Sequence, residues 1–191
     1  MLAEYYAGVI IPHKEYMLSL FQNHYLKSLT EFVGYPSYAY SLLFLEYLEH
    51  RFGNIKSENN INRSKYIDLL YATPNTGIQA IEYATGIEFN QLFADFVQMI
   101  LVNGRNITTN PKYEIPALNN PKISGYNLKE IIDTTFRLHS RNGKINKHNL
   151  ESITTNLLPY SFILTKWHNK IYSFDFNKDI NTFGSYIHVK K

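Results

Sequence analysis

Cysteine is absent from the 191 residues of the chain. Disulfide bonds, thiolate metal ligands and a cysteine nucleophile are therefore excluded, although no redox compartment follows, since envelope proteins of bacteria often lack cysteine too. The sequence also has little excess charge: its net charge is +3, and the lysines and arginines are interspersed with acids. A basic stripe is what nucleic-acid binding requires, so we expect no nucleic-acid partner.

Long apolar runs are missing as well. Glu46 and Asp95 interrupt the longest apolar stretches, so we predict no membrane-spanning segment. The first residues carry Glu4 where a secretory signal has lysine or arginine, and we expect no signal peptide in this chain. The localisation stays unassigned by these patterns. The hydrophobic content of 45% is nevertheless that of a folded protein with a real core.

Local motifs for catalysis or phosphate binding are not found. The sequence has no HExxH, GxSxG, P-loop or GxGxxG pattern. Glu46 and His50 are four residues apart, so on a helix they share one face and could hold a metal ion with another histidine, or share a proton. A solvated surface pair is the commoner meaning of this spacing. Tyr38 begins the same segment, where its hydroxyl could stabilise an oxyanion or its ring could simply pack.

What is present is a helical first half. Apolar residues recur at spacings of three and four, which predicts about five helices. We place them at 12–32, 38–52, 64–72, 76–84 and 87–103. Pro36 and Gly53 mark the two ends of the central helix, and Gly104 is the expected C-cap of the last one.

Beyond residue 106 the character of the sequence changes. Three prolines within residues 107–126 indicate an irregular connection. The stretch 127–140 suits a helix, but its centre, IIDTTF, is also a plausible strand. Alternating residues predict a hairpin at 161–176 and a strand at 185–190. We therefore predict an α+β protein, with an α-helical subdomain (1–106), an irregular connection (107–126) and a β-rich C-terminal domain (127–191).

Two blocks of this sequence carry a family resemblance. The first has Tyr-small-x-x-apolar-Leu-Phe-x-x-Tyr-Leu and ends in Phe-Gly; the second has a Thr-Gly before each of two helices, then Phe-x-x-Leu-Phe-x-Asp-aromatic. In their order and spacing they resemble the C-terminal region of hyicolysin-like zinc metallopeptidases, including spirochaete relatives. The matching positions are Tyr38, Ala39, Leu42, Leu43, Phe44, Tyr47, Leu48, Phe52 and Gly53, then Thr76, Gly77, Thr85, Gly86, Phe89, Leu92, Phe93, Asp95 and Phe96.

The resemblance implies a hydrolase of which this chain is one part. In such gluzincin-type enzymes HExxH supplies two zinc ligands and the general base, and a later Asn-Glu helix supplies the third ligand, followed by a segment similar to residues 2–8. Met1 would then directly follow the ligand glutamate. The chain would be the C-terminal part of the peptidase, with no cofactor of its own, although the complete family enzyme holds zinc. We expect it to be inactive alone, because no zinc-activated water or base is present.

The same resemblance implies partners and one site residue. The partners would be the zinc-binding N-terminal half and, in the complete enzyme, a peptide substrate; family relatives are secreted or envelope-associated. Tyr38 matches the tyrosine that leads the family's helix and becomes a candidate auxiliary transition-state donor. The alternative is a non-catalytic helical binding module, or an envelope-associated protein of unknown ligand, with the same fold. Whether the chain belongs to an enzyme therefore stays open at this point.

Overall fold

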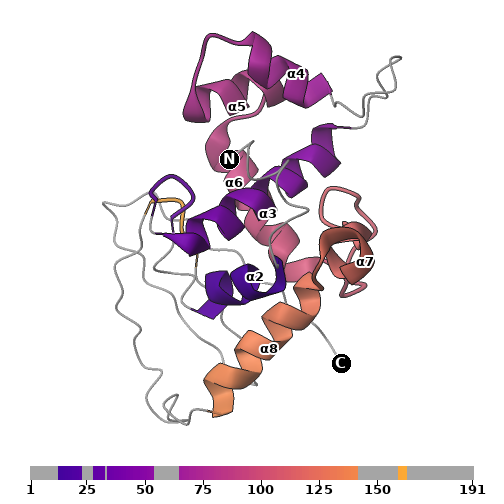
Figure 1. Ribbon diagram of the computed structural model, residues 1–191. Helices are drawn as coiled ribbons and strands as arrows, with labels where there is room; N and C mark the ends of the chain where they lie inside the picture. The colour runs from indigo at the N-terminus through magenta and orange to yellow at the C-terminus, as the bar shows by residue number, and fades with distance from the viewer. Residues whose placement is uncertain (1–12, 23–27, 33, 54–64, 142–158, 163–191) are drawn as a thin grey trace, which may run out of the picture.

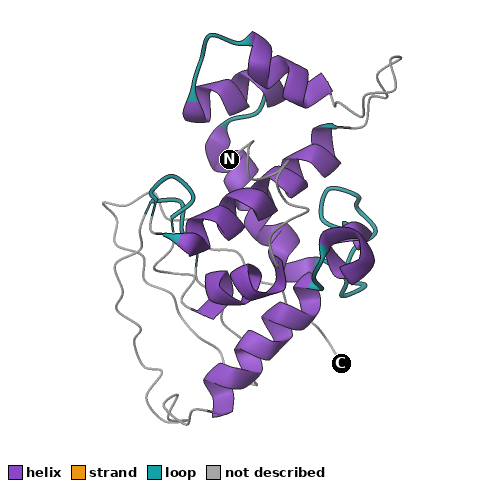
Figure 2. Ribbon diagram, in the orientation of Figure 1, coloured by secondary structure: helices purple, strands orange, loops and turns teal. Residues whose placement is uncertain are grey.

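The computed structural model describes residues 13–22, 28–32, 34–53, 65–141 and 159–162 (Figure 1). These residues form helices joined by turns and loops, and this described part of the chain contains no strand (Figure 2). The helices are α2 (His13–Gln22), α3 (Tyr35–Phe52), α4 (Lys65–Ala72), α5 (Gly77–Thr85), α6 (Phe89–Val102), the 3-10 helix η2 (Pro116–Asn119), α7 (Pro121–Ser124) and α8 (Leu128–Arg141).

The predicted α+β class is wrong for the part of the chain that the structure describes. Helix α8, of 14 residues, begins one residue into the region predicted to be β-rich. Its buried residues, Leu128, Ile131, Ile132 and Thr135, recur at helical spacing, and this period outweighs the β-branched composition that favours a strand. Residues 163–176 and 185–190, predicted as strands, lie outside the described residues.

Local sequence signals place the ends of the central helices. Pro36 lies in the first turn of α3, where its missing N–H costs no hydrogen bond and its fixed φ suits a helix. At the other end the Gly53 amide donates to the Glu49 carbonyl at 2.7 Å. Helix α5 ends at Gly86, whose φ of 68° lies in the left-handed region that glycine adopts without strain. These ends lie within three residues of those expected from the sequence.

Aromatic side chains join α3 to α6, which crosses behind it in Figure 1. Phe44 meets Phe96 edge to face at 5.1 Å between ring centroids, and it meets Phe89 at 5.6 Å. Tyr40 and Tyr47 also contact the Phe96 ring, at 6.0 and 5.6 Å. All five rings are buried. Edge-to-face pairs of this kind add about 0.5–1.5 kcal/mol each beyond the burial of their apolar area.

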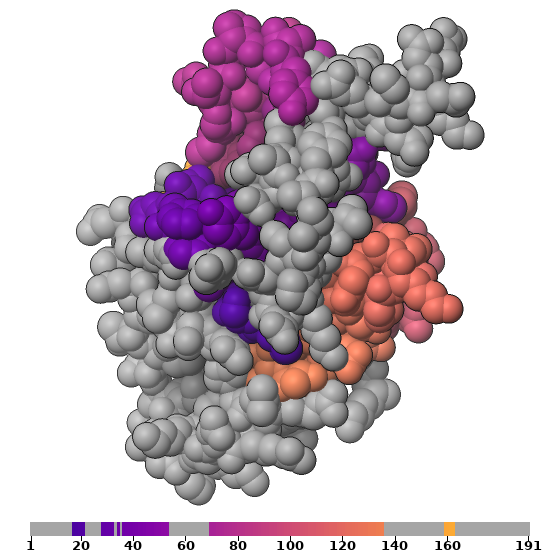
Figure 3. Space-filling view, in the orientation of Figure 1, coloured from indigo at the N-terminus to yellow at the C-terminus, as the bar shows by residue number. Residues whose placement is uncertain are grey.

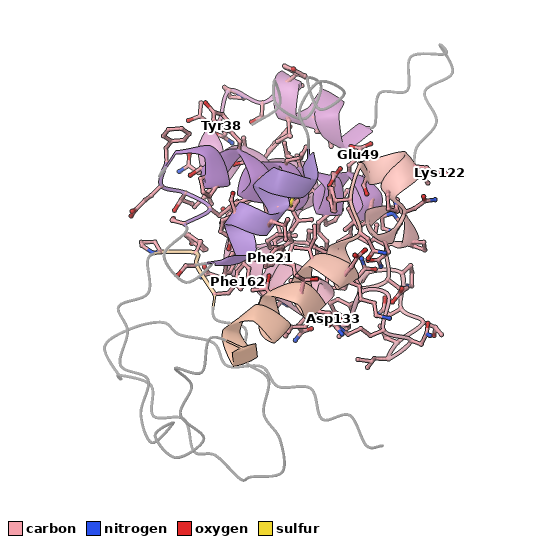
Figure 4. The ribbon with its side chains drawn as sticks, turned by 60° about the horizontal axis from the view of Figure 1, so that its bottom comes forward. Phe21, Tyr38, Glu49, Lys122, Asp133 and Phe162 are labelled. Carbon is pink, nitrogen blue, oxygen red and sulfur yellow. The ribbon has the colours of Figure 1, made fainter. Side chains whose placement is uncertain are left out.

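Helix α8 lies beside α2 and extends the same core (Figure 1). Phe21 of α2 is also next to Phe162, with ring centroids 6.3 Å apart (Figure 4). One hydrophobic cluster includes residues from each of the three predicted parts of the chain, among them Leu118 of η2 and Ile131 of α8. The three-part division itself stays a prediction.

The segment 159–162 is tied to the N-terminal half by hydrogen bonds. The carbonyl of Tyr160 accepts from the Leu29 amide at 3.2 Å and from the Tyr40 hydroxyl at 3.0 Å. The Ser28 hydroxyl donates to the Pro159 carbonyl at 2.6 Å. The backbone of Tyr160, near the C-terminal end of the described residues, is therefore hydrogen-bonded to the buried Tyr40 of α3.

Helices α4 and α5 pack on each other and form the top of the molecule, away from α2 and α8 (Figures 1 and 3). Their outer surfaces include Tyr71 and Tyr83, both more than half exposed. Among the described residues, no helix combines the length and the apolar character needed to cross a membrane.

Substitution of Tyr40 tests the hydrogen bond between its hydroxyl and the Tyr160 carbonyl. Tyr40→Phe keeps the buried ring and removes one hydrogen bond, so we expect the free energy of unfolding to fall by about 1 kcal/mol. Tyr40→Ala also removes the ring, and should cost about 3–5 kcal/mol. Urea denaturation measures both changes. Tyr83→Phe, on the exposed face of α5, is the control and should stay within about 0.5 kcal/mol of the wild type; equal losses at positions 40 and 83 would contradict the described contact.

Candidate functional site

The strongest polar cluster of the described residues centres on Asp95, which is 2% exposed although it carries a charge. Its Oδ2 accepts from Arg51 Nη1 at 2.8 Å and from Lys112 Nζ at 2.5 Å. Its Oδ1 accepts from Gln91 Nε2 at 3.0 Å and from the Tyr113 hydroxyl at 3.2 Å. Each carboxylate oxygen thus has two donors, which is what a buried ionised carboxylate requires.

Electrostatics keep Asp95 ionised in spite of its burial. Burial alone raises the pKa of the carboxyl, but hydrogen bonds and charges from Lys112 and Arg51 outweigh it and hold the pKa below its usual value. Arg51 is held in turn by the Tyr47 hydroxyl, which accepts from Nη1 at 2.6 Å, and by the Phe52 ring, 4.9 Å from the guanidinium carbon. The cluster therefore fastens the C-terminal end of α3 to α6 and to the loop that contains Lys112.

A second cluster joins α3 to the turn before α8. The hydroxyl of Tyr126, itself 1% exposed, donates to Glu46 Oε2. Burial raises the pKa of Glu46 to about 7, although the bond from Tyr126 lowers it in part. The pKa of Tyr126 lies well above its usual value because the ring is buried, and because the charge of Glu46 and its hydrogen bond from the hydroxyl both disfavour the ionised phenolate. Glu46 is thus a carboxyl that can exchange a proton near neutral pH, as acid–base groups in active sites do.

Glu46 and His50 have different hydrogen-bond partners. Glu46 bonds to Tyr126, whereas His50 bonds to the backbone of Pro111. Burial lowers the pKa of His50, and the bond to Pro111 opposes this change. In the described part of the chain, no three His, Asp or Glu side chains are close enough to share a metal ion. The metal hypothesis for this pair has no support there.

Glu46 and Arg51, which belong to these clusters, lie in the C-terminal half of α3. Tyr38 lies in its first turn, well away from Glu49 (Figure 4). Its ring meets Phe32 edge to face at 5.4 Å, and the two side chains are 37% and 70% exposed. The structure therefore places Tyr38 on the surface, next to another exposed aromatic ring. Its role as a donor in catalysis stays a prediction.

The sequence did not single out Lys112 or Tyr126, which complete the two clusters. Both lie in the proline-containing stretch 107–126, which was interpreted only as an irregular connection. The sequence shows only a lysine and a tyrosine within a polar stretch, and such residues are common in surface loops. Tyr126 bonds to Glu46 of α3, 80 residues away, and Lys112 pairs with Asp95 of α6. No local period in the sequence could have revealed either pairing.

The raised pKa of Glu46 predicts a stability that depends on pH. The folded chain holds the proton up to about pH 7, whereas the unfolded chain releases it near the ordinary carboxyl pKa of 4.5. Stability from this group is therefore complete below about pH 4.5 and falls by up to about 3 kcal/mol as the pH rises through 7. Glu46→Gln stays neutral at every pH and should remove that fall.

Urea denaturation of the wild type and Glu46→Gln at pH 4.5 and pH 8 measures the effect. We expect the variant to gain stability relative to the wild type between these two values. Tyr126→Phe removes the bond that lowers the Glu46 pKa, and should move the wild-type fall to higher pH. A difference between Glu46→Gln and the wild type that does not change with pH would contradict the assignment.

Asp95 has the opposite dependence. Asp95→Asn leaves Arg51 and Lys112 without their carboxylate, and should lower the free energy of unfolding by about 2–3 kcal/mol at pH 7, since breaking a buried ion pair costs about 3–5 kcal/mol and these cations are partly exposed. Because the folded pKa of Asp95 is lowered, the wild type loses this advantage as the pH falls below about 4.

Asp133→Asn is the matched control for this measurement. Asp133 pairs with Arg105 at 2.8 Å, but both side chains are about a quarter to a third exposed. A partly exposed pair contributes within about 1 kcal/mol, so the control should lose less than Asp95→Asn. Equal losses in urea denaturation would show that the Asp95 cluster is not energetically distinct.

Comparison with known proteins adds no assignment to this geometry. No family model matches the chain, and neither a curated protein nor a solved structure matches it. The resemblance to hyicolysin-like metallopeptidases therefore rests on the residues of the two sequence blocks.

Proposed function

We propose that this chain supplies the helical part of a hyicolysin-like zinc metallopeptidase that does not bind the zinc ion. In this role α3 and α6 form a wall behind the substrate cleft, while the zinc ion and its ligands come from a segment that contains HExxH. The role proposed for these 191 residues is structural support, because their sequence contains no HExxH to bind the zinc ion.

The observation that carries the proposal is the contact between the two sequence blocks. Phe44 and Tyr47 of the first block meet Phe96 of the second, and all three rings are buried. Asp95 of the second block binds Arg51, which follows the first block's Tyr47 by one helical turn. The positions that resemble the family therefore form one packed unit, as a shared supporting structure would require. Packing of this kind supports a fold shared with the family. A shared fold does not establish activity, and peptidase activity would depend on the zinc site that another segment supplies.

Tyr38 is the candidate functional residue of this chain within the complete enzyme. It is 37% exposed and lies in the first turn of α3. A tyrosine donor of this type would stabilise the oxyanion that forms when zinc-bound water attacks a peptide carbonyl. The ring contact with Phe32 would fix its direction.

A second function is favoured by the same exposed pair. Phe32 is 70% exposed, and with Tyr38 it presents an aromatic surface that a binding module could use to hold an apolar or aromatic group. In that case the fold would serve binding alone, and no zinc-binding segment would belong with it.

The genomic DNA next to the coding sequence separates these two functions. If the metallopeptidase proposal is right, we expect the DNA upstream of the Met1 codon to encode HExxH followed by Asn-Glu, in the same or a shifted frame. The absence of this pattern over several hundred bases would overturn the proposal and leave the binding module. As a biochemical check, the purified 191-residue chain with zinc should cleave no peptide; zinc-dependent hydrolysis would show that a different set of ligands operates.

A further inference from the structure

Three polar side chains gather around Gly104, just after the end of α6. Each is fixed by a backbone amide: Ile115 donates to Asn103 Oδ1 at 2.8 Å, and Gly104 donates to Glu114 Oε1 at 2.8 Å. The third bond comes from the Lys129 amide to Asn119 Oδ1 at 3.0 Å. Because an N–H must face oxygen, these bonds also fix which end of each amide side chain is the oxygen.

The other end of each side chain is buried and has no hydrogen-bond partner in the described part of the chain. These atoms are Asn103 Nδ2, Glu114 Oε2 and Asn119 Nδ2. Asn103 is 1% exposed, so its amide cannot turn to bulk water. A buried polar atom without a partner costs about 1–3 kcal/mol, and folded proteins rarely retain three of them together.

Gly104 lies beside all three side chains. Its φ is 70°, and a Cβ added there would lie 2.3 Å from Asn119 Nδ2. The same residue donates its amide to Glu114 and directly follows Asn103 in the chain. Only a residue without a side chain allows the Asn119 amide to come this close to the backbone.

The three atoms define the chemistry of what they bind. Two are N–H donors and one is a carboxylate oxygen that accepts. A cation would face the two donors, and an anion would face Glu114, so a neutral group that both accepts and donates fits best. Water satisfies this pattern, with two lone pairs for the amides and a hydrogen for the carboxylate.

We propose that Asn103, Glu114 and Asn119 bind one buried water molecule that links the end of α6 to the loop before η2. The loop residues Lys112 and Tyr113 directly precede Glu114 and both bond to Asp95. The water therefore acts as a positioning group for the Asp95 cluster, because it holds the loop from which these two donors reach the carboxylate. This inference is independent of the proposed metallopeptidase role.

A crystal structure of the full chain at high resolution tests the proposal. We expect density for one water within about 2.7–3.2 Å of Asn103 Nδ2, Glu114 Oε2 and Asn119 Nδ2. Direct bonds between these three side chains, with no density between them, would overturn it. Glu114→Gln can keep the bond from the Gly104 amide through its oxygen, but presents a third N–H to the site, and should lose the water.

A solution measurement keeps the test independent of crystallisation. Magnetisation transfer between water and the Asn103 side-chain amide protons should report a bound water that exchanges more slowly than the water on the protein surface. The exposed Asn75 is the control and should show no long-lived water. An Asn103 signal equal to that of Asn75 would overturn the proposal, as would an unchanged Asn103 signal in Glu114→Gln.

Discussion

The contact between the aromatic faces of α3 and α6 is the interaction on which the described structure depends. Phe96 touches Tyr40, Phe44 and Tyr47, which follow one another along nearly two turns of α3. With α2 packed on another side, α3 is covered around most of its circumference. Its polar residues are therefore placed where water reaches them poorly, and each must find a partner within the protein.

That constraint explains why the irregular stretch 103–126 is polar and well bonded. Lys112 completes the Asp95 cluster, the Tyr126 hydroxyl donates to Glu46, and Asn103 accepts from the Ile115 amide. Such a loop cannot satisfy its partners through a regular ladder of backbone bonds, so it uses side chains directed at particular atoms. The loop and the helices thus depend on each other, since the buried Asp95 carboxylate needs a cation from each of them.

The proposed function is related to this arrangement in a specific way. The residues that resemble hyicolysin-like peptidases are mostly core residues, such as Phe44 and Phe96, and their role in any protein is to hold helices in place. Tyr38 differs, because it is partly exposed, packs beside Phe32 and lies in the first turn of α3. Chemistry in a complete enzyme would therefore meet this chain at the start of α3, while the opposite end of α3 maintains the fold.

The sequence by itself determined α3, α5 and α6, because the period of their apolar residues and the proline and glycine at their ends are local signals. It did not determine α8, since the run from Ile131 to Phe136 suits a strand as well as a helix, and burial against α2 decided between them. Only the tertiary structure decided the partners of Glu46 and Asp95. Those partners come from positions up to 80 residues away, and a pairing over that distance leaves no periodic trace in the chain.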